Sequence, residues 1–219
     1  MKFEDKGMLA PFTIITSFIT GAIFPLLGSL IAFDLSSELK TYGISGIPYI
    51  EGIVLVMIGG FIAHWLLSHT VHDIFHSKIE ERHTMSKNTL KVLFVISTLV
   101  LLAIAIYLTL QKGWPVMVFA IIGAAVSMYA EGLLHHESQM AFGAMFLVIG
   151  GFYVQVGTLD LGYIIWLKVI CIAIFAFLSQ YGWLLFYRLD DYGWSKKMKN
   201  RSILITKSAL FFLLIYFLM

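Results

Sequence analysis

Seven long apolar stretches constrain the fold of this chain more than any other feature. They are 18 to 27 residues long, none holds more than one Asp, Glu, Lys or Arg, and they cover residues 8–33, 50–72, 92–111, 113–131, 138–158, 161–187 and 202–219. A helix of about 20 apolar residues crosses a bilayer core about 30 Å thick. Hydrophobic residues make up 59% of the chain and charged residues 13%, whereas soluble domains carry about 25% charged residues. The sequence therefore predicts an all-α, polytopic membrane helix bundle that forms a single transmembrane domain over 1–219.

The net charge and the cysteine count exclude nucleic-acid binding and cysteine-based sites. The net charge is +2 and basic residues never form a run longer than two, so the chain lacks the basic patch with which proteins bind nucleic acid. The single cysteine, Cys171, lies within an apolar stretch. It provides neither a disulfide framework nor a cysteine metal site.

The Lys and Arg residues are distributed asymmetrically between the predicted loops. Cytoplasmic loops of membrane proteins are enriched in these residues. With the N-terminus in the cytoplasm, the cytoplasmic segments hold eleven of them, namely Lys2, Lys6, Lys78, Arg82, Lys87, Lys91, Arg188, Lys196, Lys197, Lys199 and Arg201. The outer loops then hold only Lys40 and Lys112. We therefore expect an integral protein of the cell membrane with a cytoplasmic N-terminus and, after seven spans, an external C-terminus.

Two of the predicted cytoplasmic segments share a residue pattern that directly follows a long apolar stretch. In each, three positions lie four residues apart and a lysine follows the third; they are His69, Asp73, Ser77 and Lys78 in one segment and Tyr187, Asp191, Ser195 and Lys196 in the other. Residues four apart lie on one helical face, one turn from each other. Facing aspartates suit Mg²⁺, which often joins carboxylates to phosphates, and adjacent Lys and Arg suit a diphosphate. Spacing alone also fits solvated connectors whose acids balance their bases.

At these segments the sequence resembles the UbiA superfamily of intramembrane prenyltransferases, as a divergent and shortened member. That family carries N-x-x-x-D-x-x-x-D after its second helix and D-x-x-x-D-x-x-x-D after its sixth, which correspond here to His69, Asp73 and Ser77 and to Tyr187, Asp191 and Ser195. The segment from Gly151 to Gly157 (GFYVQVG) is similar to the fifth-helix segment of the menaquinone-pathway members. The resemblance covers the whole chain and implies a UbiA-like bundle of transmembrane helices around a central cavity.

The resemblance also implies an activity, the Mg²⁺-dependent transfer of an isoprenoid chain from a prenyl diphosphate to a lipophilic or aromatic acceptor at the cytoplasmic face. The implied catalytic residues are Asp73 and Asp191, with His69, Asp190 and Glu80 as further metal ligands. The implied diphosphate ligands are Lys78, Arg82, Lys196 and Arg201, and the implied cavity aromatics are Tyr129, Phe152, Tyr153 and Tyr187. Aromatic faces of this kind stabilise cations. Membrane lipid, the two substrates and subunits of a membrane complex are the implied partners.

Two alternatives remain open. Only the central Asp of each motif is kept, and the family usually has nine helices where this chain has seven stretches. These departures fit a catalytically inactive UbiA-like subunit, or a lipid- or quinone-binding partner of a membrane complex. The second alternative is a His-ligated membrane di-metal oxygenase. It is suggested by the spacing of His72 and His76 and by the pair His135 and His136, since histidines at such spacings ligate transition metals.

Overall fold

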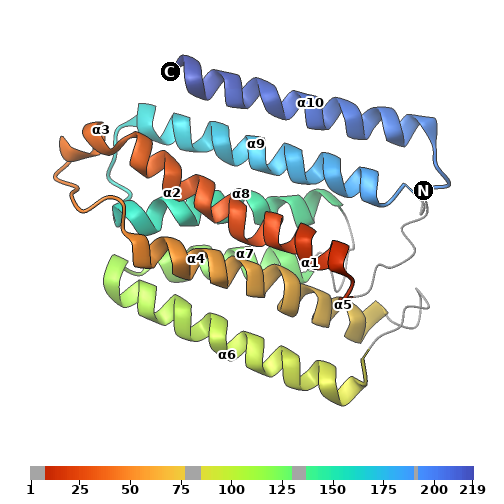
Figure 1. Ribbon diagram of the computed structural model, residues 1–219. Coiled ribbons are helices and arrows are strands. Elements are labelled where there is room, and N and C mark those ends of the chain that lie inside the picture. Colours follow the sequence, from red (N-terminus) through yellow and green to blue (C-terminus); the bar gives the residue numbers. More distant parts are fainter. Residues whose placement is uncertain (1–7, 77–84, 130–136, 190–191) are drawn as a thin grey trace.

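A computed structural model describes residues 8–76, 85–129, 137–189 and 192–219, with the backbone alone for 75–76 and 127–129. All elements of the described chain are helical (Figure 1). In chain order they are α1 (Pro11–Phe18), η1 (Ile19–Ile23), α2 (Phe24–Asp34), α3 (Ser36–Lys40), α4 (Ile50–Ile62), η2 (Ala63–Ser68), α5 (His69–His76), α6 (Lys87–Lys112), α7 (Pro115–Tyr129), α8 (Glu137–Val156), α9 (Tyr163–Tyr187) and α10 (Lys196–Leu218). The segments η1 and η2 are π-helical and continue the helices on either side of them.

The prediction of a helical membrane protein is confirmed. Within the described ranges, six helical stretches are long and apolar enough to cross a membrane, namely Pro11–Asp34, Ile50–Ile74, Lys87–Lys112, Glu137–Val156, Tyr163–Tyr187 and Lys196–Leu218. The remaining predicted span, 113–131, corresponds to the shorter α7 of 15 residues. This described part rises about 22 Å, less than the thickness of the hydrocarbon core. A count of seven spans therefore stays a prediction.

Two helices begin earlier than the apolar stretches predict. Helix α6 begins at Lys87 rather than at residue 92, and α10 begins at Lys196 rather than at residue 202. The α6 start is capped by Ser86, whose hydroxyl oxygen accepts a hydrogen bond of 3.2 Å from the backbone N–H of Thr89. Such a cap satisfies a backbone donor that the helix itself leaves unpaired. Hydropathy marks only the apolar part of each helix, so it misses the first charged turns.

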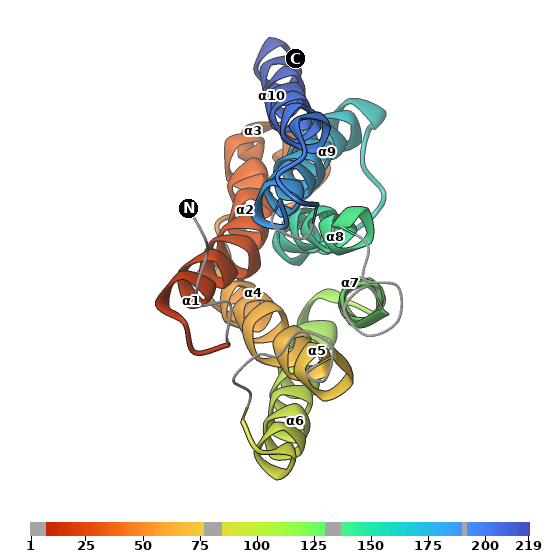
Figure 2. The same cartoon turned by 90° about the vertical axis from the view of Figure 1, so that its right-hand side faces the viewer.

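The long helices run roughly side by side in an elongated cross-section, with α10 at one edge and α6 at the other (Figure 2). Helix α10 packs against α9, α9 against α8, and α8 against α2 and α7. The main buried core lies between α2, α8 and α9 and includes Phe24, Val148, Phe152 and Val169. The helices around α4 and α7 form the other half of the bundle, which contains the candidate site.

Helices α2 and α8 approach each other through glycines. A Cβ atom on Gly28 would lie 1.9 Å from the backbone oxygen of Val148, and one on Gly151 would lie 2.1 Å from the backbone oxygen of Pro25. The hydroxyl of Ser29 donates a hydrogen bond of 3.2 Å to the backbone oxygen of Gly151. Small residues commonly let membrane helices pack with their backbones in contact. This contact therefore depends on the absence of side chains at both glycines.

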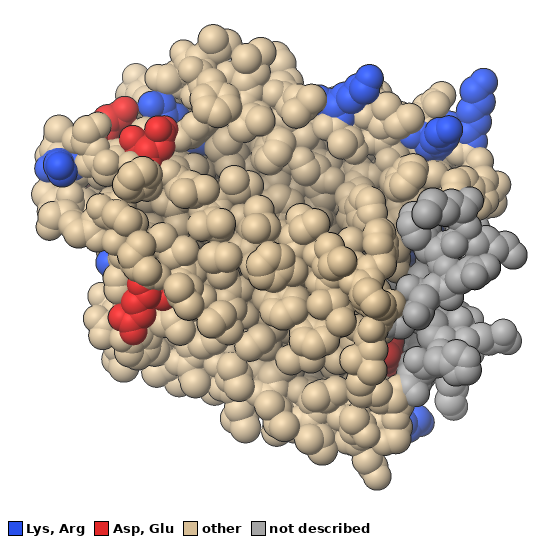
Figure 3. Space-filling model, viewed as in Figure 1, with Lys and Arg blue, Asp and Glu red and all other residues tan. Residues whose placement is uncertain are grey.

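Apart from Lys207, which is exposed midway along α10, the described charged residues gather at the two ends of the bundle and leave a broad uncharged belt on the face seen in Figure 3. The end where α6 and α10 begin, here called the basic end, carries seven described cations: Lys87, Lys91, Arg188, Lys196, Lys197, Lys199 and Arg201. The opposite end carries Lys40, Lys112 and Lys168 together with Asp34, Glu38, Glu51 and Asp160. An uncharged belt between charged ends is expected of a protein that crosses a bilayer.

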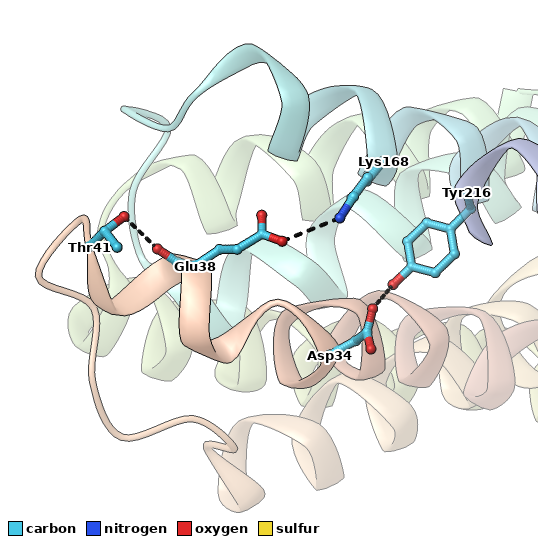
Figure 4. A network of polar contacts seen from close by, with 5 residues as sticks. All are labelled: Asp34, Glu38, Thr41, Lys168 and Tyr216. Atoms are coloured by element: carbon cyan, nitrogen blue, oxygen red, sulfur yellow. Dashed lines mark hydrogen bonds and ion pairs between the residues drawn. The ribbon is translucent and has the colours of Figure 1, made fainter. Parts of the chain in front are cut away.

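Polar contacts join four helices at the opposite end, α3 to α9 and α2 to α10 (Figure 4). Lys168 of α9 is 9% exposed, and its Nζ lies 3.3 Å from Oε1 of Glu38 on α3. Tyr216 of α10 donates a hydrogen bond of 2.6 Å to Oδ2 of Asp34 on α2. Thr41 donates a hydrogen bond of 2.7 Å to the backbone oxygen of Glu38. Lys168, a cation within an apolar helix, thus has a structural partner that anchors α3.

Candidate functional site

A cavity of about 170 Å³ lies between α4, α6, α7 and α8, and residues of α2, η1 and η2 also line it. Its wall is almost wholly apolar and includes Leu55, Ile104, Phe119, Phe146 and Leu147. A cavity of about 150 Å³ with an apolar lining can hold benzene. This space therefore accommodates a single ring or a short branched hydrocarbon segment.

Glycines leave this space open. A Cβ atom on Gly123 would lie 3.8 Å from Cβ of Phe146, and one on Gly150 would lie 3.7 Å from Cβ of Phe119. These are ordinary van der Waals distances, so a side chain at either position would extend into the cavity. Gly60 also lines the cavity, but its Cβ would lie 1.9 Å from the backbone oxygen of Gly21. The cavity thus combines glycines that allow close helix contact with glycines that keep space free.

Both π-helical segments contribute a polar side chain to the cavity. Thr20 lies in η1 and His64 lies in η2. The Thr20 hydroxyl donates a hydrogen bond of 3.0 Å to Oε1 of Gln180, whereas Nδ1 of His64 is buried and has no hydrogen-bond partner among the described residues. The π-helical turn is rare and is found frequently at functional sites. We therefore treat this part of the wall as the polar side of the site.

Further polar atoms without partners lie between the cavity and the basic end. The Thr13, Ser17 and Thr70 hydroxyl oxygens and Oε1 of Gln139 are buried and make no hydrogen bond within the described chain. Thr13 and Ser17 precede Thr20 by two turns and one turn on the same helical face. Together with His64, the one member of the group that lines the cavity itself, these four residues are here called the polar mouth. An unpaired buried polar atom costs about 1–3 kcal/mol, so the polar mouth is suited to water or the polar head of a ligand.

The first Asp-rich segment begins on α5, next to the polar mouth. Asp73 is 5% exposed, and its Oδ1 lies 3.3 Å from Nδ1 of His72. Nδ1 of His69 contacts the backbone oxygen of His64 at 3.0 Å. A buried carboxylate near a membrane surface is costly and commonly serves a function. The other residues predicted for this segment, Ser77, Lys78, Glu80 and Arg82, lie outside the described residues.

The structure describes only the flanks of the second Asp-rich segment. Asp190 and Asp191 lie outside the described residues, so the predicted pairing of Asp191 with Asp73 stays a prediction. Tyr187 stacks on Phe12, with 6.2 Å between the ring centroids. The predicted diphosphate ligands Lys196 and Arg201 are exposed on the first turns of α10. Arg201 donates a hydrogen bond of 2.6 Å from Nη2 to the Tyr181 hydroxyl.

The aromatic side chains predicted to line the cavity lie elsewhere or lack a described side chain. Phe152 of α8 packs against α2 and α9 in the main core, with its ring centroid 5.7 Å from that of Trp166. The Tyr129 side chain is outside the described part. Phe119 and Phe146, which the sequence reasoning did not single out, line the cavity instead. Positions on a helix do not reveal which face the neighbouring helices enclose, so the sequence alone could not identify them.

The segment from Tyr153 to Gly157 joins three helices at the opposite end. The Tyr153 hydroxyl donates hydrogen bonds of 3.0 Å and 3.2 Å to the backbone oxygens of Lys112 and Gly157. The Gln155 amide bonds both backbone groups of Tyr49, at 2.7 Å through Oε1 and 3.2 Å through Nε2. Gly157 has a φ of +70°, a conformation that glycine adopts without strain. The described contacts give this segment a structural role.

A buried ion pair at the basic end was not anticipated from the sequence. Glu137, in the first turn of α8, is 3% exposed and lies 2.8 Å from Nη1 of Arg188 at the end of α9. The Tyr192 hydroxyl donates a hydrogen bond to the same carboxylate oxygen. A carboxylate in the first turn also interacts favourably with the helix dipole. This ion pair holds the α8 start against the α9 end, beside the second Asp-rich segment.

The described residues do not by themselves make up a magnesium site. Within the described ranges, no group of three or more His, Cys, Asp or Glu side chains is close enough to hold a metal ion. Asp73 offers a suitable oxygen, but Asp191, Asp190 and Glu80 are not described. Mg²⁺ binds several oxygen ligands, so we derive no step through it. The histidine pair of the oxygenase alternative, His135 and His136, also lies outside the described residues.

Comparison with known proteins identifies no similar protein. No family model matches the sequence, and neither a curated protein nor a solved structure matches it. The UbiA resemblance therefore depends on the residues quoted above for its motifs, and the functional argument depends on the cavity and its surroundings.

Proposed function

We propose that the protein is a UbiA-type prenyltransferase of the membrane, and that it moves an isoprenoid chain from a prenyl diphosphate to a lipophilic or aromatic acceptor. The observation that carries the proposal is the apolar cavity whose polar mouth lies toward the basic end, close to the buried Asp73. An apolar space next to polar and cationic groups suits a ligand with a hydrocarbon chain and an anionic head.

The basic end is the cytoplasmic end in this proposal, because positive residues favour that side. The N-terminus is then cytoplasmic and the C-terminus lies outside. The diphosphate would lie among the cations of the basic end, of which Lys196 is exposed and described. Part of the isoprenoid chain would enter the cavity of about 170 Å³, and the rest would lie between helices and lipid.

In the proposed reaction, the bond between the allylic carbon and the diphosphate oxygen breaks, and the diphosphate leaves with the electron pair. The allylic carbon forms a bond with the acceptor, which then loses a proton. Cations at the basic end would stabilise the leaving diphosphate. The family resemblance implies Mg²⁺, which would need ligands from outside the described residues. The proposal therefore assigns no step to Mg²⁺ and includes the ion only in the assay below.

A second candidate is a non-catalytic subunit that binds a lipid in the same cavity. The contact of Arg201 with Tyr181 favours it, because the guanidinium already donates a 2.6 Å hydrogen bond to the phenol and lies 5.6 Å from the ring centroid. An arginine held in this way has fewer donors left for a diphosphate. The two candidates differ in whether a prenyl group is transferred.

Binding of tritiated geranylgeranyl diphosphate to the purified protein, with Mg²⁺ present, tests the proposal. We expect saturable, Mg²⁺-dependent binding that Asp73→Asn weakens by roughly tenfold or more, because the family resemblance implies that this carboxylate helps to hold the Mg²⁺ supplied in the assay, and without the metal it would repel the diphosphate. Asp160→Asn removes an exposed carboxylate at the opposite end and should leave binding unchanged. With a membrane lipid extract added as the source of acceptor, label recovered in a larger lipid product supports transfer, and saturable binding without a product supports the second candidate. Absence of binding by the unmodified protein, or equal binding by both variants, contradicts the proposal.

A further inference from the structure

We propose that His64 recognises a neutral oxygen atom, a hydroxyl or a carbonyl, on the lipid whose apolar part occupies the cavity. The inference concerns the same cavity as the proposed function. It requires only that a lipid binds there and does not depend on chain transfer.

His64 lies at the boundary between the apolar cavity and the polar mouth. On its helix, the cavity-lining residues run from Leu55 to His64, so His64 is the last of them toward the basic end. It is ten residues from the end of the span at Ile74, a distance of about 15 Å along a helix. A ligand atom next to His64 is therefore well below the membrane surface.

The surroundings of the imidazole leave one ring nitrogen for a ligand. Its Nδ1 is enclosed by protein atoms and has no partner in the described chain, so the nitrogen left for a ligand in the cavity is Nε2, which makes no hydrogen bond there either. The ring packs edge-on near His69 at a centroid distance of 6.1 Å. Thr20, the other polar residue in this part of the wall, already donates to Gln180. A ring nitrogen either donates or accepts, depending on the tautomer. A hydroxyl satisfies both cases and a carbonyl satisfies the donor case.

The cavity wall also indicates the charge of the group that it can receive. The described lining contains no Lys or Arg. An anionic group buried there would lose its hydration without a cation to compensate, which is strongly unfavourable. A neutral oxygen needs only one hydrogen bond to be accommodated. The observations therefore favour a hydroxyl or carbonyl next to His64.

A matched pair of ligands tests this inference in detergent-solubilised protein. The probe is tritiated geranylgeraniol, and the competitors are unlabelled geranylgeraniol and the C20 hydrocarbon of the same skeleton without the hydroxyl. We expect the unmodified protein to bind the alcohol roughly tenfold more tightly than the hydrocarbon. His64→Leu should abolish this preference while still binding the hydrocarbon, and His64→Gln, which keeps a hydrogen-bonding amide, should retain part of it.

The outcomes separate this inference from the proposed function. An equal preference for the alcohol in the unmodified protein and in His64→Leu would overturn the inference, and so would the absence of any preference in the unmodified protein. If His64→Leu fails to fold, the His64→Gln and His64→Asn variants decide the matter. The inference then requires that the longer Gln side chain keeps more of the preference for the alcohol than the shorter Asn side chain. A His64-dependent preference in a protein that transfers no prenyl group supports the inference while the transferase proposal fails.

Discussion

Replacing Gly151 with alanine should lower the free energy of unfolding by about 3 kcal/mol or more, since overpacking by this amount forces backbones apart. The new Cβ would lie 2.1 Å from the backbone oxygen of Pro25. The atom that it meets is backbone, which cannot move aside as a flexible side chain can. Helices α2 and α8 would have to separate, and the 3.2 Å hydrogen bond from Ser29 to the Gly151 oxygen would be lost.

The adjacent glycine provides the control. At Gly150 the nearest atom to a Cβ is Cβ of Phe119 at 3.7 Å, and alanine is a better helix former than glycine by about 1 kcal/mol. Gly150→Ala should therefore leave the free energy of unfolding unchanged or raise it slightly. Both variants can be compared by unfolding in mixed detergent micelles. Equal effects of the two substitutions would show that α2 and α8 do not meet as described.

Removal of the Arg188 guanidinium is the second large effect. Arg188→Met should destabilise the fold by about 3–5 kcal/mol, the range found when one partner of a buried ion pair is removed. Glu137 is 3% exposed and would lose the cation that lies 2.8 Å away. The Tyr192 hydroxyl would still donate to the carboxylate but has no positive charge to replace that of the guanidinium.

Two further variants isolate this effect. Lys199→Met removes an exposed cation from the first turn of α10, which lies at the same basic end as Arg188. This substitution should change the free energy of unfolding by less than about 0.5 kcal/mol. The double variant Arg188→Met with Glu137→Gln removes both charges and should regain much of the lost stability. If Arg188→Met were as mild as Lys199→Met in the same unfolding assay, the ion pair would not hold α8 against α9.

The sequence supported the class of fold because hydropathy is a property of continuous segments. Each predicted stretch contains a helix, and most boundaries agree within a few residues. Where they differ, as at Lys87 and Lys196, polar residues continue a helix beyond the apolar part. Depth in the membrane can be inferred from one segment at a time, which is why this part of the prediction succeeded.

The site depends on which helix faces meet, and a single sequence does not carry that information. Phe152 and Phe119 are both aromatic residues in apolar helices, yet Phe152 packs in the core and Phe119 lines the cavity. His64 could have been singled out from the sequence, since a histidine in the middle of an apolar span is costly to bury and commonly serves a function. The sequence indicates a role for Glu137 less clearly, because an acid at the start of a predicted span is common. Its partner Arg188 is 51 residues away.

Filling the cavity tests most directly whether it is the binding site. Gly123→Leu places a branched side chain where a Cβ has Phe146 as its nearest neighbour at 3.8 Å, and Ala103→Leu adds the same bulk on an exposed face of α6. The measurement is the affinity for tritiated geranylgeranyl diphosphate, with thermal unfolding as the check on the fold. We expect Gly123→Leu to weaken binding by roughly tenfold or more, because the displaced apolar segment loses its burial, while Ala103→Leu binds as the unmodified protein does. Unchanged affinity in a folded Gly123→Leu variant would contradict a ligand in this cavity.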